Sequence, residues 1–226
     1  MELKVNLVPE SVTILGAKIG LSVVTGWIIT AALVLLLVVN YFLVIRRMKP
    51  TPRGLQSLWE LAVESAHKWT SGKVGKTCAD FVAPVVMTLM TYVFFTTIVE
   101  LFGFEPATSD INCTFAMGLC TFLLVNVTGL KYRGVRGRLR GLATPSAVVF
   151  PIRVLTDFIA PCSIAIRLFA NVMVGGIIMQ LIYAVVPIVL PAIISSYFNV
   201  LHVLIQTFVL GLLSLVYVSE AMGEEE

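Results

Sequence analysis

Long, uninterrupted stretches of apolar residues decide which folds are open to this chain. One stretch covers residues 19–45, two more cover 78–101 and 111–130, and residues 151–222 form two further stretches in succession. About 20 apolar residues cross the hydrocarbon core of a bilayer as a helix, whereas the strands of a membrane barrel are short and alternate in polarity. The sequence therefore predicts an all-α membrane protein with five transmembrane helices in a single domain, 1–226.

Composition excludes a water-soluble globule. Hydrophobic residues make up 58% of the 226 residues and charged residues 13%, against about 45–50% and about 25% in soluble domains. The net charge of +3 comes from clusters at the ends of apolar runs, so no nucleic-acid partner is expected. The four cysteines lack the spacing of metal ligands, and we expect them to pack in the membrane without a metal: Cys78, Cys113, Cys120 and Cys162.

Residues 54–70 differ from the five spans. Leu55, Leu58 and Ala62 recur at helical spacing, while polar residues cover the opposite side. Trp59 and Trp69 suit the headgroup layer of a membrane. This segment is predicted to be an amphipathic helix at the membrane surface.

Positive charge predicts the orientation. Thirteen of the sixteen Lys and Arg residues lie between Arg46 and Arg153, in segments that share one side of the membrane if there are five spans. Cytoplasmic loops carry this excess, so residues 131–149 are predicted to be a basic cytoplasmic loop. The N-terminal residues 1–18 then lie outside, the C-terminus lies in the cytoplasm, and the protein is expected in the cell membrane.

The last two apolar stretches are too long for upright spans. A helix of 36 residues is about 54 Å long, against a hydrocarbon core of about 30 Å. We therefore expect 151–222 to be a steeply tilted helical hairpin that faces a large partner.

Arg167 is the strongest single signal, because it lies near the middle of its apolar stretch. A charge there costs about 2.5–3.5 kcal/mol on insertion scales, and arginine does not lose its proton. No Asp or Glu lies within a turn of it. Its counter-charge is expected from another helix or another subunit.

Polar residues accompany Arg167 at helical spacing. Ser163 and Asn171 lie four residues before and after it, which places the three on one helix face. In the next stretch, Asn199, His202 and Gln206 share a face, and Tyr217 continues the polarity toward the end of the helix. These residues predict a water-lined path, although small polar residues that bond the backbone remain an alternative.

Three segments resemble subunit a of F-type ATP synthases: PIRVLTDFIAPCSIAIRLFANVMVGG, LIQTFVLGLLSLVYVSEA and ELFGFEPATSDINCTFAMGL. The first is similar to the arginine helix of that family. In the second, a glutamine precedes a tyrosine by eleven positions, as Gln206 and Tyr217 do here. In the third, Thr108, Asp110 and Asn112 match the family's spacing. The resemblance covers nearly the whole chain.

The resemblance implies a non-catalytic stator that holds no cofactor. Its partners would be the ring of c subunits, the b subunits of the peripheral stalk and the rest of the synthase, in membrane lipid. Arg167 would be the arginine between two ion half-channels, with Gln206 helping to position it. The transported ion would be H⁺ or Na⁺, and its passage would turn the ring.

The predicted topology assigns residues to each half-channel. The outer one is expected to include Asn199, His202, Asp110, Asn112 and Glu100. The inner one is expected to include Ser163, Thr156 and Asp157.

Several positions depart from the family pattern. Gly176 stands where the family usually has a carboxylate, Arg153 replaces a glutamate, and Ala160 replaces a basic residue. Asn199 takes a position that is often acidic or His. His202 is expected to substitute in the outer path, since histidine titrates near neutral pH, or the path relies on water and Glu100.

A self-contained secondary transporter or ion channel with a central arginine is the alternative. Such proteins commonly show inverted repeats, which are absent from this sequence. An intramembrane enzyme is disfavoured because no Ser/His/Asp, paired-Asp or HExxH arrangement is present, and there is no phosphate-binding loop for ATP.

Overall fold

The computed structural model describes residues 11–14, 17–43, 46, 54–102, 104–143, 150–185 and 189–223. The regular elements, in chain order, are β1 (Ser11–Ile14), β2 (Ala17–Gly20), α1 (Leu21–Leu43), α2 (Leu55–Val74), α3 (Lys76–Ile98), η2 (Val99–Phe102), η3 (Ala107–Ser109), α4 (Ile111–Ala143), α5 (Phe150–Val185) and α6 (Val189–Met222).

Five of these helices are long and apolar enough to cross a membrane: α1, α3, α4, α5 and α6. Helix α2 is the exception, because polar side chains occupy one side of it. The predicted all-α membrane architecture with one amphipathic helix is confirmed, and the chain is a multi-pass membrane protein.

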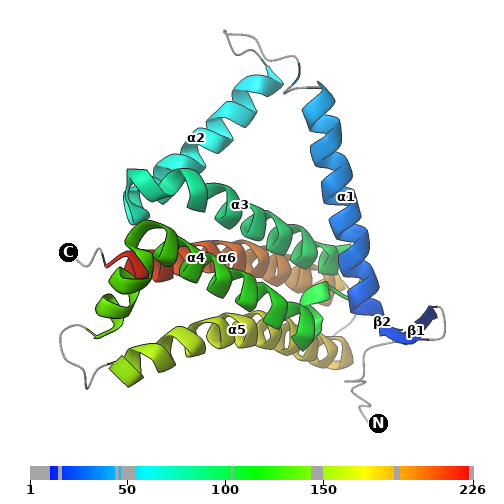
Figure 1. Cartoon of the computed structure of the whole chain (residues 1–226). Coiled ribbons are helices and arrows are strands. Elements are labelled where there is room, and N and C mark those ends of the chain that lie inside the picture. Colours follow the sequence, from blue (N-terminus) through cyan, green and yellow to red (C-terminus); the bar gives the residue numbers. More distant parts are fainter. Residues whose placement is uncertain are drawn as a thin grey trace.

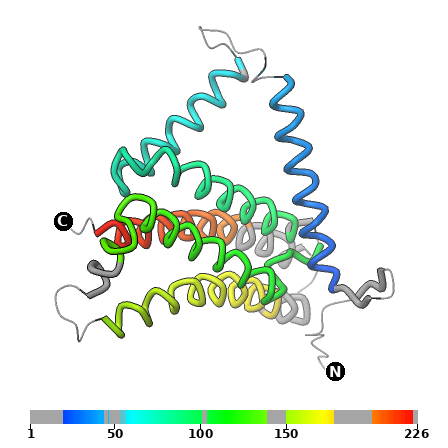
Figure 2. The backbone as a smooth tube through the Cα atoms, viewed as in Figure 1, coloured from blue at the N-terminus to red at the C-terminus, as the bar shows by residue number. Residues whose placement is uncertain are grey.

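Helices α3 to α6 lie side by side, and α1 stands away from them (Figure 1). Helices α1 and α3 meet near one end of the bundle and diverge, and α2 joins their separated ends, so the three outline a triangle. Figure 2 shows the same path as a tube, with the C-terminus at the end of the bundle where α2 meets α3. We call this the C-terminal end of the bundle, and the opposite end, near the start of α1, the N-terminal end.

The core forms two clusters along the helices α2 to α6. One cluster of buried residues includes Val82 and Val86 of α3 with Leu215 and Val218 of α6. A second cluster, further along the bundle, comprises Val93, Met117, Ile164, Leu168 and Leu210. Side chains four apart share one helix face, so each helix presents a narrow apolar stripe to its neighbours.

Glycine allows two close helix crossings. A Cβ atom at Gly118 of α4 would lie 2.5 Å from the backbone oxygen of Pro161 in α5. At Gly211 of α6 it would collide with the side chain of Met90 in α3. Small residues at such points let membrane helices approach closely.

The basic segment is not the predicted loop. The structure describes it as helix as far as Ala143, with a kink at Gly134, where φ is +68°. Arg and Leu are good helix formers, and of the glycines in this segment Gly134 is the one with positive φ. Residues 144–149 lie outside the described part of the chain.

Two smaller differences concern the ends of elements. Helix α2 continues to Val74, beyond the predicted end at residue 70, and only Gly75, whose φ of +79° turns the chain, separates it from α3. The N-terminal segment contains an antiparallel pair, β1 with β2, in which Ser11 faces Gly20. This pair was not predicted, because its residues do not alternate in polarity over a useful length.

Candidate ion-translocation site

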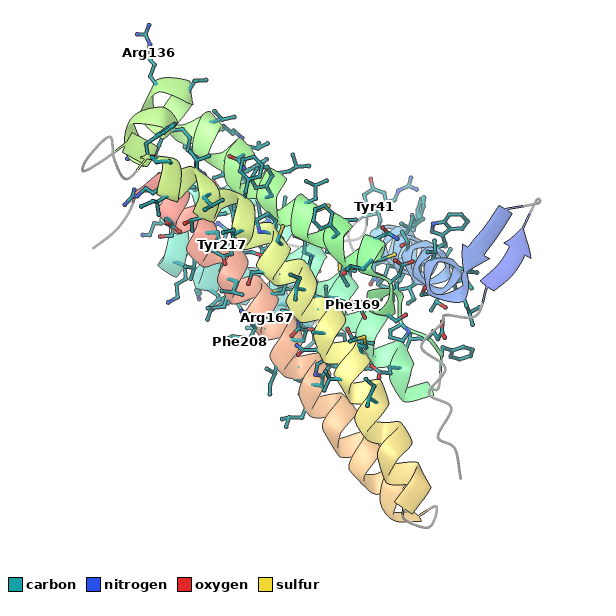
Figure 3. All side chains as sticks on the ribbon, turned by 90° about the horizontal axis from the view of Figure 1, so that it is seen from below. Tyr41, Arg136, Arg167, Phe169, Phe208 and Tyr217 are labelled. Carbon is teal, nitrogen blue, oxygen red and sulfur yellow. The ribbon has the colours of Figure 1, made fainter. Side chains whose placement is uncertain are left out.

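Arg167 lies on the open face of α5. Its side chain is exposed, like those of its neighbours Ile166, Met173 and Val174, whereas Leu168 on the other side is 1% exposed. Figure 3 shows Arg167 and Phe208 of α6 on the same flank of the helix pair and Phe169 on the other flank. The guanidinium is therefore accessible to a partner that packs against this flank of α5 and α6.

Arg167 has no ion pair or hydrogen bond with any other residue that the structure describes. That its counter-charge comes from another helix or another subunit stays a prediction. An arginine keeps its charge under all ordinary conditions, so the open face of α5 carries a permanent positive charge.

A hydrogen bond links α5 and α6 next to the arginine. The side-chain amide of Asn171 donates to the Oε1 atom of Gln206 over 2.7 Å. Gln206 is 5% exposed, and Asn171 is half-buried one turn beyond Arg167. The bond fixes the two helices relative to each other at the level of the arginine.

His202 lies one turn from Gln206 on α6, and its side chain is half-buried. Its Nε2 atom is buried and has no hydrogen-bond partner among the described residues. Water is the usual partner of such an atom. The side chain of Asn199, the next predicted residue toward the N-terminal end, lies outside the described side chains, so its role stays a prediction.

Glu100 lies in η2 beyond the end of α3 and is half-buried. Burial raises its pKa to about 6 from 4.5, because desolvation disfavours the charged form. The turn η2 contacts α6. A carboxyl group that titrates near neutral pH therefore lies at the end of the bundle where the outer path was predicted.

Asp110 and Asn112 form the start of α4. The Oδ1 atom of Asp110 accepts from the backbone N of Asn112 over 2.8 Å and from its side-chain amide over 3.0 Å. This is the pattern of an acidic residue at a helix N-terminus, which stabilises the helix. Their part in an ion path stays a prediction.

On the other side of Arg167, the predicted inner residues divide into two groups. With about 100° of rotation per residue, Thr156 and Ser163 lie within about 40° of Arg167 on α5, and Asp157 lies about 80° away. The side chain of Thr156 is exposed and bonds the carbonyl of Ile152. Thr156 and Ser163 share the open face, whereas Asp157 turns toward α4.

Asp157 forms an ion pair with Arg138. The Nη2 atom of Arg138 lies 2.7 Å from the Oδ2 atom of Asp157, and the two side chains are 10% and 27% exposed. Sequence reasoning missed this pair, because Arg138 looked like one of several loop arginines.

A small cleft between α4, α5 and α6 borders this ion pair at the C-terminal end. Tyr217 lines it and also packs against both core clusters. The remaining lining residues are Thr121, Phe122, Val125, Asn126, Asp157, Ala160, Pro161, Ile164 and Glu220. Asn126 and Glu220 were not predicted as site residues. Asn126 is an isolated polar residue within a predicted span, and Glu220 lies near the end of α6.

No group of three or more His, Cys, Asp or Glu residues lies close enough to hold a metal ion within the described ranges. The polar residues of the site instead follow α5 and α6 along the bundle. Such an arrangement suits a path for ions more than a fixed ion site.

Comparison with known proteins places this geometry in a family. The family model described as ATP synthase A chain matches residues 25–219. The chain belongs to the ATP synthase subunit a family. It is 30% identical to ATP synthase subunit a of Moorella thermoacetica, over 88% of each chain. It is 31% identical to ATP synthase subunit a 2 of a Bradyrhizobium strain, over 89% of this chain and 88% of the relative.

The family match covers both the arginine helix and the glutamine helix, and it confirms the resemblance inferred from the sequence. One relative is the sodium-ion-specific ATP synthase subunit a of Propionigenium modestum, 32% identical over 56% of this chain and 45% of the relative. Members of the family thus include at least one that is named for Na⁺. The chain is accordingly a subunit of an ATP synthase complex in a membrane.

Proposed function

We propose that this chain is the non-catalytic stator that carries ions past a rotating ring of c subunits, and that Arg167 separates two half-channels. The observation that carries the proposal is the exposed guanidinium of Arg167 on the open flank of α5, unpaired with any described residue. A fixed cation attracts a deprotonated carboxylate on the ring and displaces its ion. It also repels ions that would leak directly from one side to the other.

The residues around Arg167 support this role. The bond between Asn171 and Gln206 holds α5 and α6 together beside the arginine. It limits the motion of the helix on which Arg167 sits, so that the guanidinium meets each ring carboxylate in one geometry.

The outer half-channel is proposed at the N-terminal end of the bundle. Glu100 supplies a carboxyl group whose pKa of about 6 lets it exchange protons near neutral pH, His202 supplies a half-buried imidazole, and Asp110, Asn112 and Asn199 line the approach. These groups stand in for the carboxylate that the family pattern has at the position of Gly176. The inner half-channel follows Thr156 and Ser163 on the open face of α5, with Asp157 at its border.

The proposed orientation places the C-terminal end of the bundle in the cytoplasm. Lys131, Arg133 and Arg136 gather at that end, and positive residues remain on the cytoplasmic side of membranes. Five spans then place the N-terminus outside. Proposed partners are the c ring, the b subunits of the peripheral stalk and the lipid, and no bound cofactor is expected.

Purification of the complex through a tag on this chain tests the proposal. A ring of small hairpin proteins should co-purify, and the complex in lipid vesicles should pump ions when ATP is added. Pumping with and without Na⁺ identifies the ion. A chain that purifies without a ring and carries out transport alone would instead support the self-contained transporter.

A further inference from the structure

The side chain of Arg138 is buried, which is unusual for an arginine in a basic segment. It is 8% exposed, and its Nε atom is buried without a hydrogen-bond partner among the described residues. By contrast, Arg136, two residues earlier, is exposed and points away from the bundle (Figure 3). The positive-inside rule explains Arg136, but it does not explain why Arg138 is buried.

The kink at Gly134 turns the last part of α4 back on the bundle. A Cβ atom at Gly129 would lie 3.2 Å from the Cδ atom of Arg138 and 3.7 Å from Ala221 of α6. The stem of Arg138 therefore lies against α4 where α4 faces α6, and its guanidinium reaches Asp157 of α5. One side chain thus connects α4 to α5, and Gly129 leaves the space for it.

We propose that Arg138 and Asp157 are positioning residues that fix α5 against α4, and thereby set the depth at which Arg167 meets the ring. The proposal rests on the function proposed above. Asp157 precedes Arg167 by ten residues, which is about 15 Å of helix. The α4–α5 crossing at Gly118 and Pro161 lies between them, so a shift at one point is carried along α5 to the other.

The geometry favours positioning over ion conduction by Asp157. Its carboxylate is engaged by a guanidinium that stays charged. It also lies about 80° around the helix from Arg167, on the side that faces α4. A carboxylate that accepts and releases ions in the inner path needs the open face that Thr156 and Ser163 occupy.

The test compares four variants in the purified complex: Arg138→Gln, Asp157→Asn, the exchanged pair Arg138→Asp with Asp157→Arg, and Arg136→Gln. Arg136→Gln removes the same charge from the same segment without touching the pair. ATP-driven pumping per assembled complex is measured as a function of pH, with Arg167→Ala as a reference. Pumping by the wild type and its loss in Arg167→Ala show that the proposed function itself holds.

The single variants at 138 and 157 should lower pumping per assembled complex by about tenfold, since small misplacements of a functional group cost large factors in rate. They should also move the pH of half-maximal pumping. The exchanged pair should recover most of the rate, and Arg136→Gln should match the wild type. A substitution that only destabilises the chain would reduce the amount of complex and leave the pH profile unchanged.

Two results would overturn the proposal. Wild-type pumping by Arg138→Gln and Asp157→Asn would show that the pair has no part in positioning. Failure of the exchanged pair to recover, with passive proton conduction lost whenever residue 157 lacks a carboxylate, would make Asp157 a group of the inner path. If the single variants do not assemble, the exchanged pair decides the matter: its assembly with most of the wild-type rate supports the proposal, and its failure to recover overturns it.

Discussion

Two arginines in this chain, Arg138 and Arg167, differ in burial and in ion pairing. Arg138 is buried at the C-terminal end of the bundle and paired with Asp157 over 2.7 Å. Arg167, near the middle of an apolar helix, is exposed on its flank and bonded to no other described side chain. For a buried pair such as Arg138 with Asp157, removal of one partner costs about 3–5 kcal/mol of stability. For Arg167 the position itself is unfavourable, because it places an unpaired charge near the membrane centre.

The difference separates structure from function. A charge that is satisfied within its own chain holds helices together. An arginine without a counter-charge among the described residues is unfavourable at mid-membrane unless a partner supplies that charge. Here the proposed partner is the ring carboxylate. The predictions below test this contrast.

The largest effect is expected from Arg167→Ala. Loss of the fixed cation should reduce ATP-driven pumping by about 100-fold or more and should raise the passive leak of ions. The amount of assembled complex should stay the same, because Arg167 has no hydrogen bond or ion pair with a described residue that could be lost. Dye-quenching assays in inverted vesicles, with the complex quantified on the same sample, measure both quantities. Pumping at the wild-type rate would show that Arg167 has no functional role and would contradict its contrast with Arg138.

A smaller loss is expected from Gln206→Leu. It leaves the amide of Asn171 without its acceptor, and an unsatisfied buried polar group costs about 1–3 kcal/mol. Pumping should fall by about tenfold. Ser214→Ala is the matched control on the same helix, since among the described residues its hydroxyl donates only to the carbonyl of Leu210 one turn earlier. Equal effects from the two substitutions would show that the bond to Asn171 has no special role.

Much of the fold could be predicted, because lipid imposes simple rules on a sequence. Residues 19–45 and 78–101 corresponded to α1 and α3 to within a few residues, and 111–130 corresponded to the first part of α4, since apolar length alone decides a span. The helical basic segment could not be predicted. Its three glycines, Gly134, Gly137 and Gly141, suggested a loop, and only the structure shows that Gly134 alone among them adopts a positive φ.

Gly118→Val tests the close crossing that carries the proposed positioning. The added side chain would force α5 away from α4 at Pro161, and overpacking of this kind costs about 1–3 kcal/mol. A lower dissociation temperature of the complex is expected, with pumping reduced several-fold. Gly72→Ala in α2, where a Cβ meets nothing within 4 Å, should leave the dissociation temperature unchanged or slightly higher.

The smallest effect concerns Glu100. Its pKa is raised to about 6 from 4.5, so the folded chain binds this proton more tightly than the unfolded chain. Stability from this group is present below pH 4.5 and is lost as pH rises to about 6. Glu100→Gln removes that loss, so its stability relative to the wild type should increase over this window by at most about 2 kcal/mol.

The same variant tests the outer path. If Glu100 relays protons, passive conduction should fall about twofold and lose its dependence on pH near 6. Conduction that keeps the wild-type pH profile would leave His202 as the titrating group of that path.

The site could be predicted only in part. Arg167, Asn171 and Gln206 were found because helical spacing and mid-membrane polarity act within one helix. Which side chains meet across helices depends on crossings and kinks, which apolar periodicity does not encode. For that reason neither the bond between Asn171 and Gln206 nor the partner of Asp157 could be foreseen.

Cysteine cross-linking to the ring tests the central claim most directly. A cysteine at 166, whose side chain is 61% exposed beside Arg167, is combined with a cysteine next to the carboxylate of the ring subunit, and oxidation is followed by electrophoresis. Ile166→Cys should form a disulfide with the ring and Leu168→Cys, buried on the other side, should not. A disulfide from position 168 with none from 166 would contradict the account, because Arg167 would then face away from the acid that it is proposed to meet.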